Sequence, residues 1–172
     1  MKTFRLLFSD DMARAIVSGR KTVTRRPVVP HDIFDDFKTL PPIGLKAPCA
    51  PGDILIGREC WRRDLFGYEY RASSPHHERS KWRPSIHMPD AAARIRRRVV
   101  SVTVERLQDV TIQDAVRAGF PTDRHGGTDA RNDFLCAWDD IYINRRLASA
   151  VNPWVWRIEF ASENEQDVSN GR

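Results

Sequence analysis

Segments with the two-residue period of a β-strand alternate along this chain with segments that have the spacing of an α-helix. Val100, Val102 and Val104 alternate with polar residues, which predicts a half-buried strand. Further strands are predicted at residues 3–8, 21–26, 54–59, 66–72 and 154–160. Helical spacing predicts helices at residues 11–18 and 134–142, and a cap at Thr111 with Gly119 at the end predicts a third. Several short strands with interspersed helices predict an α+β domain built on a small closed barrel.

The chain of 172 residues has the length of one domain that can bury a core of its own. We expect this domain to span residues 1–160. Irregular insertions are expected near residues 28–51, which are rich in proline, and near residues 73–90, which are polar. The polar segment 161–172 is expected to be a disordered tail.

The charge balance is moderately basic, with 28 Lys and Arg residues against 23 Asp and Glu residues and a net charge of +5. Two basic clusters stand out, one at residues 20–26 and one at residues 94–98. Such clusters are usually solvated surface, but two of them beside strands of one small domain also fit a nucleic-acid partner. Both interpretations stay open at this point.

No apolar run approaches the length that spans a membrane, and the N-terminus lacks the pattern of a signal peptide. The three cysteines, Cys49, Cys60 and Cys136, are odd in number and have no metal-ligand spacing. They are typical of a reducing compartment, so we expect a cytoplasmic protein without a metal site. The sequence also lacks a glycine-rich phosphate loop and a dinucleotide fingerprint, so no cofactor is expected.

The segment Gly19–Arg26 carries four cations and two hydroxyls between a predicted helix and a predicted strand. Gly19 is suited to end the helix in a left-handed cap. A lysine at such a junction, beside hydroxyls that the next strand holds rigidly, can do acid–base or nucleophilic chemistry. The same residues could instead bind a phosphate, or form a solvated basic edge.

This segment resembles the Gly-Arg-Lys-Thr-x-Thr-x-Arg signature of the ASCH family, which belongs to the PUA-like superfamily. Residues 51–61 resemble the Pro-Gly-Asp, apolar strand, Arg-Glu-x-Trp segment of the phage and prophage branch of that family. Further matches follow at residues 82–89, 104–110 and 152–156. The five motifs occur in order over nearly the whole chain.

The resemblance implies a PUA-like small β-barrel of five to six strands with two to three covering helices. In the related bacterial acetylcytidine amidohydrolases, the signature lysine accepts a proton, the second threonine is the nucleophile and a glutamate donates a proton. The first two roles fall on Lys21 and Thr24. Ala118 occupies the glutamate position, and alanine has no proton to give.

Another carboxylate would therefore have to replace the missing glutamate. Glu59 is the first candidate, because it ends a strand and belongs to the Arg-Glu-x-Trp pattern. Asp114 is the second candidate, one turn before Ala118. A salt bridge from Glu59 to Arg58 or Arg26 is an equally strong structural alternative.

Candidate binding residues are of two kinds. Aromatic side chains in or beside loops can stack on an unpaired base, and cationic or polar side chains can hold phosphate or carbonyl oxygens. The candidates are Arg20, Arg26, Trp61, Tyr70, Trp82, Ser85, His87, Arg96, Arg97 and Arg98.

From these observations we expect a protein that binds a nucleoside or a base of single-stranded RNA in a barrel-mouth pocket. Hydrolysis of N-acyl cytosine, by Lys21 and Thr24 with help from Glu59, is the activity that the resemblance implies. The alternatives are a non-catalytic RNA-binding module, a ribonuclease and a scaffold role in phage assembly. No membrane partner is expected, and a monomer or weak dimer fits the sequence.

Overall fold

The computed structural model describes residues 1–28, 44, 46–74, 81–121 and 129–162. Its main element is a five-stranded sheet with the strand order β1-β3-β6-β7-β2. The strands are β1 (Thr3–Leu7), β2 (Val23–Pro27), β3 (Ile54–Arg58), β6 (Ile95–Arg106) and β7 (Trp154–Phe160). β1 and β3 run parallel, and the other neighbouring strands are antiparallel.

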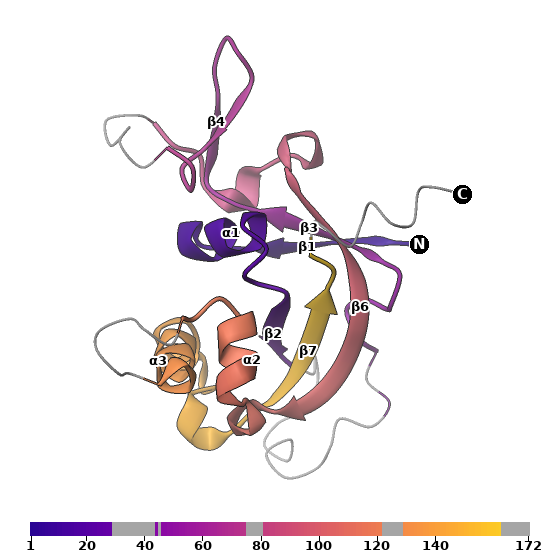
Figure 1. Cartoon of the computed structure of the whole chain (residues 1–172), viewed down its shortest axis with the longest axis vertical. Coiled ribbons are helices and arrows are strands. Elements are labelled where there is room, and N and C mark those ends of the chain that lie inside the picture. The colour runs from indigo at the N-terminus through magenta and orange to yellow at the C-terminus, as the bar shows by residue number, and fades with distance from the viewer. Residues whose placement is uncertain (29–43, 45, 75–80, 122–128, 163–172) are drawn as a thin grey trace.

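β6 is 12 residues long and belongs to both halves of the sheet. Its first residues, Ile95–Arg98, pair with β3, whereas residues 99–106 pair with β7. The register shifts between Val99 and Ser101. Such a bulge bends a strand and increases its twist. Figure 1 shows the consequence, since β6 curves along the whole side of the molecule and joins the β1/β3 half to the β7/β2 half.

Three α-helices lie against the sheet: α1 (Asp10–Val17), α2 (Ile112–Arg117) and α3 (Ala130–Tyr142). Each begins at a side-chain cap, with Ser9, Thr111 and Asp129 accepting backbone N–H groups. α1 buries Ile16 in a cluster with Leu55, Ile95 and Phe160. α2 and α3 share a second cluster with Val23, Leu107 and Val155. In the described part of the chain, these two clusters and two further ones, around Met88 and around Ile158, form the core.

A two-stranded hairpin projects from the rest of the molecule, at the top of Figure 1. It consists of β4 (Trp61–Arg63) and β5 (Tyr68–Tyr70), which are antiparallel. The Asp64 carboxylate orders the turn between them, accepting the N–H groups of Phe66 at 2.8 Å and Gly67 at 3.0 Å. Short 3-10 turns complete the fold: η2 (Ser85–His87), η3 (Asp90–Ala92), η4 (Leu107–Asp109), η5 (Ile143–Arg145) and η6 (Ser149–Val151).

The structure confirms the predicted α+β class, with a five-stranded sheet, three α-helices and a small second sheet. A closed barrel is not found among the described strands, because β1 and β2 are the outer strands of the main sheet. Arg26 on β2 donates a hydrogen bond to the Leu7 carbonyl on β1 at 3.0 Å. A side chain therefore links the outer strands where a barrel would have a backbone ladder.

Two sequence expectations fall largely outside the described residues. They are most of the insertion near residues 28–51 and the tail beyond residue 162. Of the insertion near residues 73–90, the described part contains η2 and the start of η3. Within the described part of the chain, no helix combines the length and the apolar character needed to cross a membrane.

Candidate functional site

A cavity of about 170 Å³ lies between the start of α1, strand β2 and helix α3. Its walls are mostly apolar and aromatic, with a group of cations and hydroxyls along the β2 side. The lining residues are Leu7, Phe8, Ser9, Met12, Lys21, Thr24, Arg25, Arg26, Phe120, Phe134, Ala137, Trp138, Ile141 and Tyr142. We call this cavity the β2 pocket.

Lys21 and Thr24, the two signature residues, both line the β2 pocket. Gly19 adopts a φ of 73° directly after α1, a conformation that favours glycine and turns the chain toward β2. The Lys21 N–H then donates to the Ala15 carbonyl at 2.9 Å, which fixes the start of the turn. Thr24 follows on β2, opposite Ile158 of β7. The side chains of both residues are buried against the pocket.

The Lys21 amine is buried without a carboxylate partner in the described part of the chain. Its Nζ donates to the Ala118 carbonyl oxygen at 2.6 Å. Burial and the nearby charges of Arg26 and Arg25 lower the pKa of Lys21 well below its ordinary value. The site therefore favours the neutral amine, which has a lone pair and can accept a proton.

Thr24 offers its hydroxyl to the same pocket. Its side chain forms no hydrogen bond with any residue that the structure describes, although only 3% of Thr24 is exposed. A hydroxyl that is not engaged within the fold can form hydrogen bonds with water or with a ligand in the pocket. Lys21 and Thr24 are thus a possible base and a free hydroxyl on one wall.

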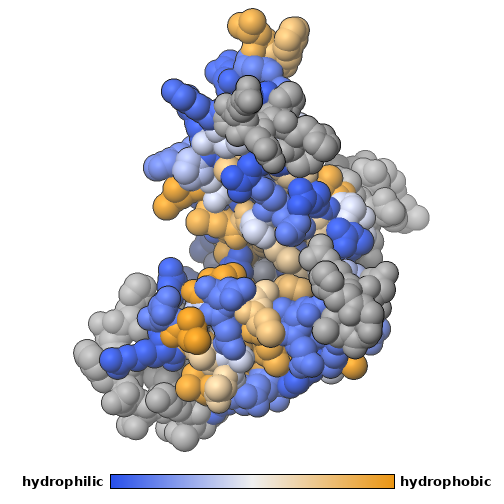
Figure 2. Space-filling model, turned by 90° about the vertical axis from the view of Figure 1, so that its left-hand side faces the viewer, coloured by the Kyte–Doolittle hydropathy of each residue, from blue (hydrophilic) through white to orange (hydrophobic). Residues whose placement is uncertain are grey.

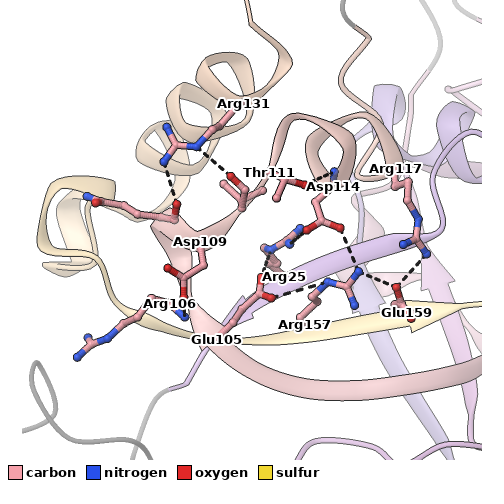
Figure 3. Close-up of polar contacts among 12 residues, drawn as sticks. Arg25, Glu105, Arg106, Asp109, Thr111, Asp114, Arg117, Arg131, Arg157 and Glu159 are labelled. Carbon is pink, nitrogen blue, oxygen red and sulfur yellow. Dashed lines mark hydrogen bonds and ion pairs between the residues drawn. The ribbon is translucent and has the colours of Figure 1, made fainter.

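Arg25, which lines the β2 pocket, is held by an ion-pair network (Figure 3). Its Nε lies 2.6 Å from Glu105 and its Nη2 lies 3.2 Å from Asp114. Arg157 joins the same network, 3.0 Å from Asp114 and 2.6 Å from Glu159. Since the Arg25 side chain is fully buried, these carboxylates compensate its charge within the fold.

Arg26 is the second arginine on the pocket wall. It donates to the carbonyls of Arg25 and Leu7, and its guanidinium lies 5.5 Å from the centre of the Phe8 ring. Burial lowers the pKa of Arg26, and the adjacent Tyr142 hydroxyl partly offsets this effect. Among the described residues no carboxylate forms an ion pair with Arg26, so its guanidinium can interact with a carbonyl or anionic oxygen of a ligand.

The structure does not bring Glu59 to the β2 pocket. Glu59 is fully buried elsewhere, and Arg94 donates to both of its carboxylate oxygens, at 2.8 and 2.9 Å. The expected salt-bridge alternatives, Arg58 and Arg26, are not its partners in these contacts. A carboxylate that is engaged in this way at a distance from the pocket lining does not support a role beside Lys21.

Neither Asp114 nor Ala118 can donate a proton to the pocket at neutral pH. Burial alone would raise the pKa of Asp114, but the hydrogen bond from Arg157 and the charges of Arg25 and Arg157 outweigh it and lower this pKa. Asp114 is therefore ionised at neutral pH. Ala118 is 1% exposed, packs in the α2/α3 core cluster and contributes its carbonyl to Lys21.

The other aromatic candidates separate into core and surface positions. Trp61 is 4% exposed and packs in a core cluster with Met88, so its ring is not offered to a ligand. The Tyr70 hydroxyl donates to the Ala92 carbonyl at 2.8 Å, and Arg94 stacks 4.1 Å from the ring centre. Trp82 is half-buried and lines a second cavity together with Ser85.

The remaining cationic and polar candidates do not form one binding surface with the β2 pocket. Arg20 is exposed and lines a separate cavity beside α1, and His87 is exposed at the end of η2. Arg96, Arg97 and Arg98 lie on β6, where alternation buries Arg97 and exposes the two on either side. The predicted cluster is therefore split between the two faces of the sheet.

Sequence reasoning missed most of the pocket's aromatic wall. Phe134, Trp138 and Tyr142 occur at helical spacing on α3, and this spacing predicts only that they share one apolar face. They do belong to a core cluster, and they also line the β2 pocket. Phe8 and Phe120 complete the wall. The available signal was the density of aromatic residues on one face of α3, which fits a core and a pocket wall equally well.

Comparison with known proteins supports the fold alone. No family model matches the sequence, and no curated protein matches it. Among solved structures, the chain is similar to protein EF3133 from Enterococcus faecalis, described with the family model DUF984. The sequences are 12% identical, the TM-score is 0.50, and the match covers 95% of this chain and 81% of that chain. The ASCH relationship remains a resemblance in the sequence motifs.

Proposed function

We propose that the β2 pocket binds a nucleobase and that Lys21 and Thr24 hydrolyse an N-acyl group on it, as in N-acyl cytosine. The observation that carries the proposal is the pairing of an amine with a lowered pKa and a free hydroxyl in one aromatic-lined pocket. Flat aromatic walls suit a base, since every base has a face that can stack.

The proton transfers need no residue besides Lys21 and Thr24. Neutral Lys21 accepts the Thr24 hydroxyl proton as the oxygen attacks the acyl carbon. The negative charge then develops on the former carbonyl oxygen, and Arg26 on the pocket wall can stabilise it. As the C–N bond breaks, Lys21 returns its proton to the amino group of the base. Water, deprotonated by Lys21, then hydrolyses the acyl ester on Thr24 and restores the hydroxyl.

This scheme replaces the expected contribution of Glu59. A lysine that takes and returns the same proton acts as both base and acid, so the missing family glutamate does not by itself exclude turnover. The described residues that line the pocket include no carboxylate, and this favours a second candidate function. In that case the pocket binds a base of RNA without changing it.

The proposal is tested by following deacetylation of N4-acetylcytidine by the wild-type protein and by Lys21→Met and Thr24→Val. We expect hydrolysis by the wild type and a loss of at least about a hundredfold in each variant, because each removes a reacting group. Thr22→Val is the matched control, since Thr22 lies in the same segment but not in the pocket lining. It should retain activity.

Two results would contradict the enzymatic proposal. One is full activity in Thr24→Val or Lys21→Met. The other is cytidine binding without any turnover of the acetylated nucleoside, which selects the non-catalytic binder.

A further inference from the structure

The Lys21 amine is buried in the fold and also borders a cavity. Lys21 is 5% exposed, and its Nζ donates to the Ala118 carbonyl oxygen at 2.6 Å. The same side chain lines the β2 pocket, between α1 and α3. Figure 2 looks at the side of the molecule that carries these helices and shows it narrowed at mid-height, with apolar groups above and below. A small ligand that enters the pocket from this side meets the amine.

An amine in these surroundings is suited to attack on carbon as well as to proton transfer. In the described part of the chain no carboxylate pairs with Lys21, and the charges of Arg25 and Arg26 lie nearby. Burial and these two charges lower the pKa of Lys21, so a larger fraction of this amine keeps its lone pair than of an exposed lysine. Lysines that are desolvated in an apolar pocket or placed beside another cation form Schiff bases with carbonyl compounds.

The β2 pocket also contains the groups that a carbonyl ligand needs. Phe134 and Trp138 line it with aromatic rings, against which an aromatic ligand can pack. The Arg26 guanidinium on the wall can bind a carbonyl oxygen, and the Thr24 hydroxyl can donate to the oxygen that leaves as water. An apolar cavity of about 150 Å³ can hold benzene. The β2 pocket, at about 170 Å³, therefore admits one ring with a short substituent that reaches Lys21.

We propose that Lys21 is a covalent binding site for small aromatic aldehydes, which it holds as a Schiff base in the β2 pocket. The nitrogen lone pair attacks the carbonyl carbon and one amine proton passes to the carbonyl oxygen, which gives a carbinolamine. The hydroxyl group then leaves with the second nitrogen proton as one molecule of water, and a C=N bond remains. Nothing is oxidised or reduced, and addition of water reverses the reaction. This activity goes beyond N-acyl hydrolysis and does not depend on it, because it needs the amine and the pocket but no acyl transfer.

The test treats the full chain with 2-hydroxybenzaldehyde. Sodium borohydride then reduces any imine to a stable amine, which mass spectrometry of peptides assigns to one lysine. Exposed Lys2, Lys46 and Lys81 are internal controls in the same protein. We expect Lys21 to be labelled at least about tenfold more than each of them at pH 7, because the neutral fraction of an ordinary lysine falls about tenfold for each pH unit below its pKa. Raising the pH to near 10 should reduce this preference, and unfolding in urea should abolish it.

Two comparisons show whether the pocket contributes in addition to the amine. Propanal has no ring to pack against the aromatic wall, so the preference for Lys21 should be several-fold smaller with propanal than with the aromatic probe. Lys21→Met should lose the pocket label. Arg20→Met should keep it, because Arg20 is the neighbour of Lys21 in the sequence but does not line the β2 pocket.

The outcomes separate this inference from the proposed function. Labelling of Lys21 that does not exceed that of the exposed lysines at pH 7, or that is equally strong with propanal, overturns the Schiff-base site. Hydrolysis of N4-acetylcytidine by such a protein would leave the proposed function standing without it. If Lys21 is labelled selectively but cytidine does not slow the labelling and acetylcytidine is not hydrolysed, the proposed function fails and the Schiff-base site stands.

Discussion

At the scale of single residues, the Lys21 amine determines what the site can do. An ammonium group buried beside two arginines is destabilised, and the protein relieves this cost by favouring the neutral form. The Ala118 carbonyl orients the amine with one hydrogen bond but supplies no countercharge. Burying this amine lowers the stability of the folded protein and, at the same time, makes the amine more reactive as a base.

The first prediction concerns the stability cost of this lysine. The pKa of Lys21 is lower in the folded state than in the unfolded state. At pH values between these two pKa values, the unfolded chain therefore binds more protons than the folded protein. Stability therefore rises with pH over that interval, up to the ordinary lysine value of 10.5. Lys21→Met should raise the free energy of unfolding by about 1–2 kcal/mol at pH 7, with a smaller gain near pH 10.

Urea unfolding at the two pH values measures this effect, with exposed Lys2→Met as the matched control. The opposite result would be a Lys21→Met variant that is less stable than the wild type at pH 7, by an amount that does not change with pH. This would show that the buried lysine does not destabilise the fold.

At the scale of elements, Arg25 joins three parts of the fold. It lies on β2 and pairs with Glu105 on β6 and Asp114 on α2. Its guanidinium also lies 5.5 Å from the centre of the Phe134 ring on α3. The network in Figure 3 therefore connects β2 to β6 and to α2.

We predict that Arg25→Met lowers the free energy of unfolding by about 2–4 kcal/mol, because it leaves two partly buried carboxylates with fewer partners. Arg25→Lys should not rescue most of this loss, since one ammonium cannot bridge Glu105 and Asp114 as a planar guanidinium does. Denaturant unfolding measures both. The exposed Arg20→Met serves as the control and should change stability by less than about 0.5 kcal/mol.

A second element-scale prediction concerns the close approach of β3 and β6. A Cβ added at Gly57 would lie 2.6 Å from Ile95 Cγ2 and 2.9 Å from Ile95 Cβ. Ile95 is fully buried, so it has little room to move. Gly57→Ala should therefore cost about 1–3 kcal/mol of stability, measured by thermal or urea unfolding. An unchanged melting temperature would mean that β3 and β6 can move apart to accommodate the added methyl group without a loss of stability.

The elements also show where sequence patterns succeed and fail. The helix cap at Thr111 and the apolar spacing of α3 predicted real helices, because capping and helical periodicity are local properties. The start of β6 was missed, because Arg96, Arg97 and Arg98 resemble a basic surface cluster. Pairing with β3 incorporates them into the sheet, and this long-range contact has no signature in the residues themselves.

At the scale of the whole molecule, the sheet curves around its buried core clusters and leaves the β2 pocket near its outer strands. The α+β class was predictable from the order of strand and helix patterns. The open edge was not predictable, because closure depends on whether β1 and β2 meet, and each has an ordinary strand pattern. The pocket likewise assembles residues from the chain's start, β2 and α3 that no single motif contains.

The pH dependence of N4-acetylcytidine hydrolysis tests the central claim most directly, because it reports the ionisation of the proposed base during turnover. The account predicts a rate that rises with pH along a limb whose midpoint lies well below 10.5, the ordinary pKa of lysine. Thr22→Val should show the same limb, and Lys21→Met should lose both the limb and the activity. A wild-type protein with no turnover at any pH, or a limb that survives in Lys21→Met, would contradict the account.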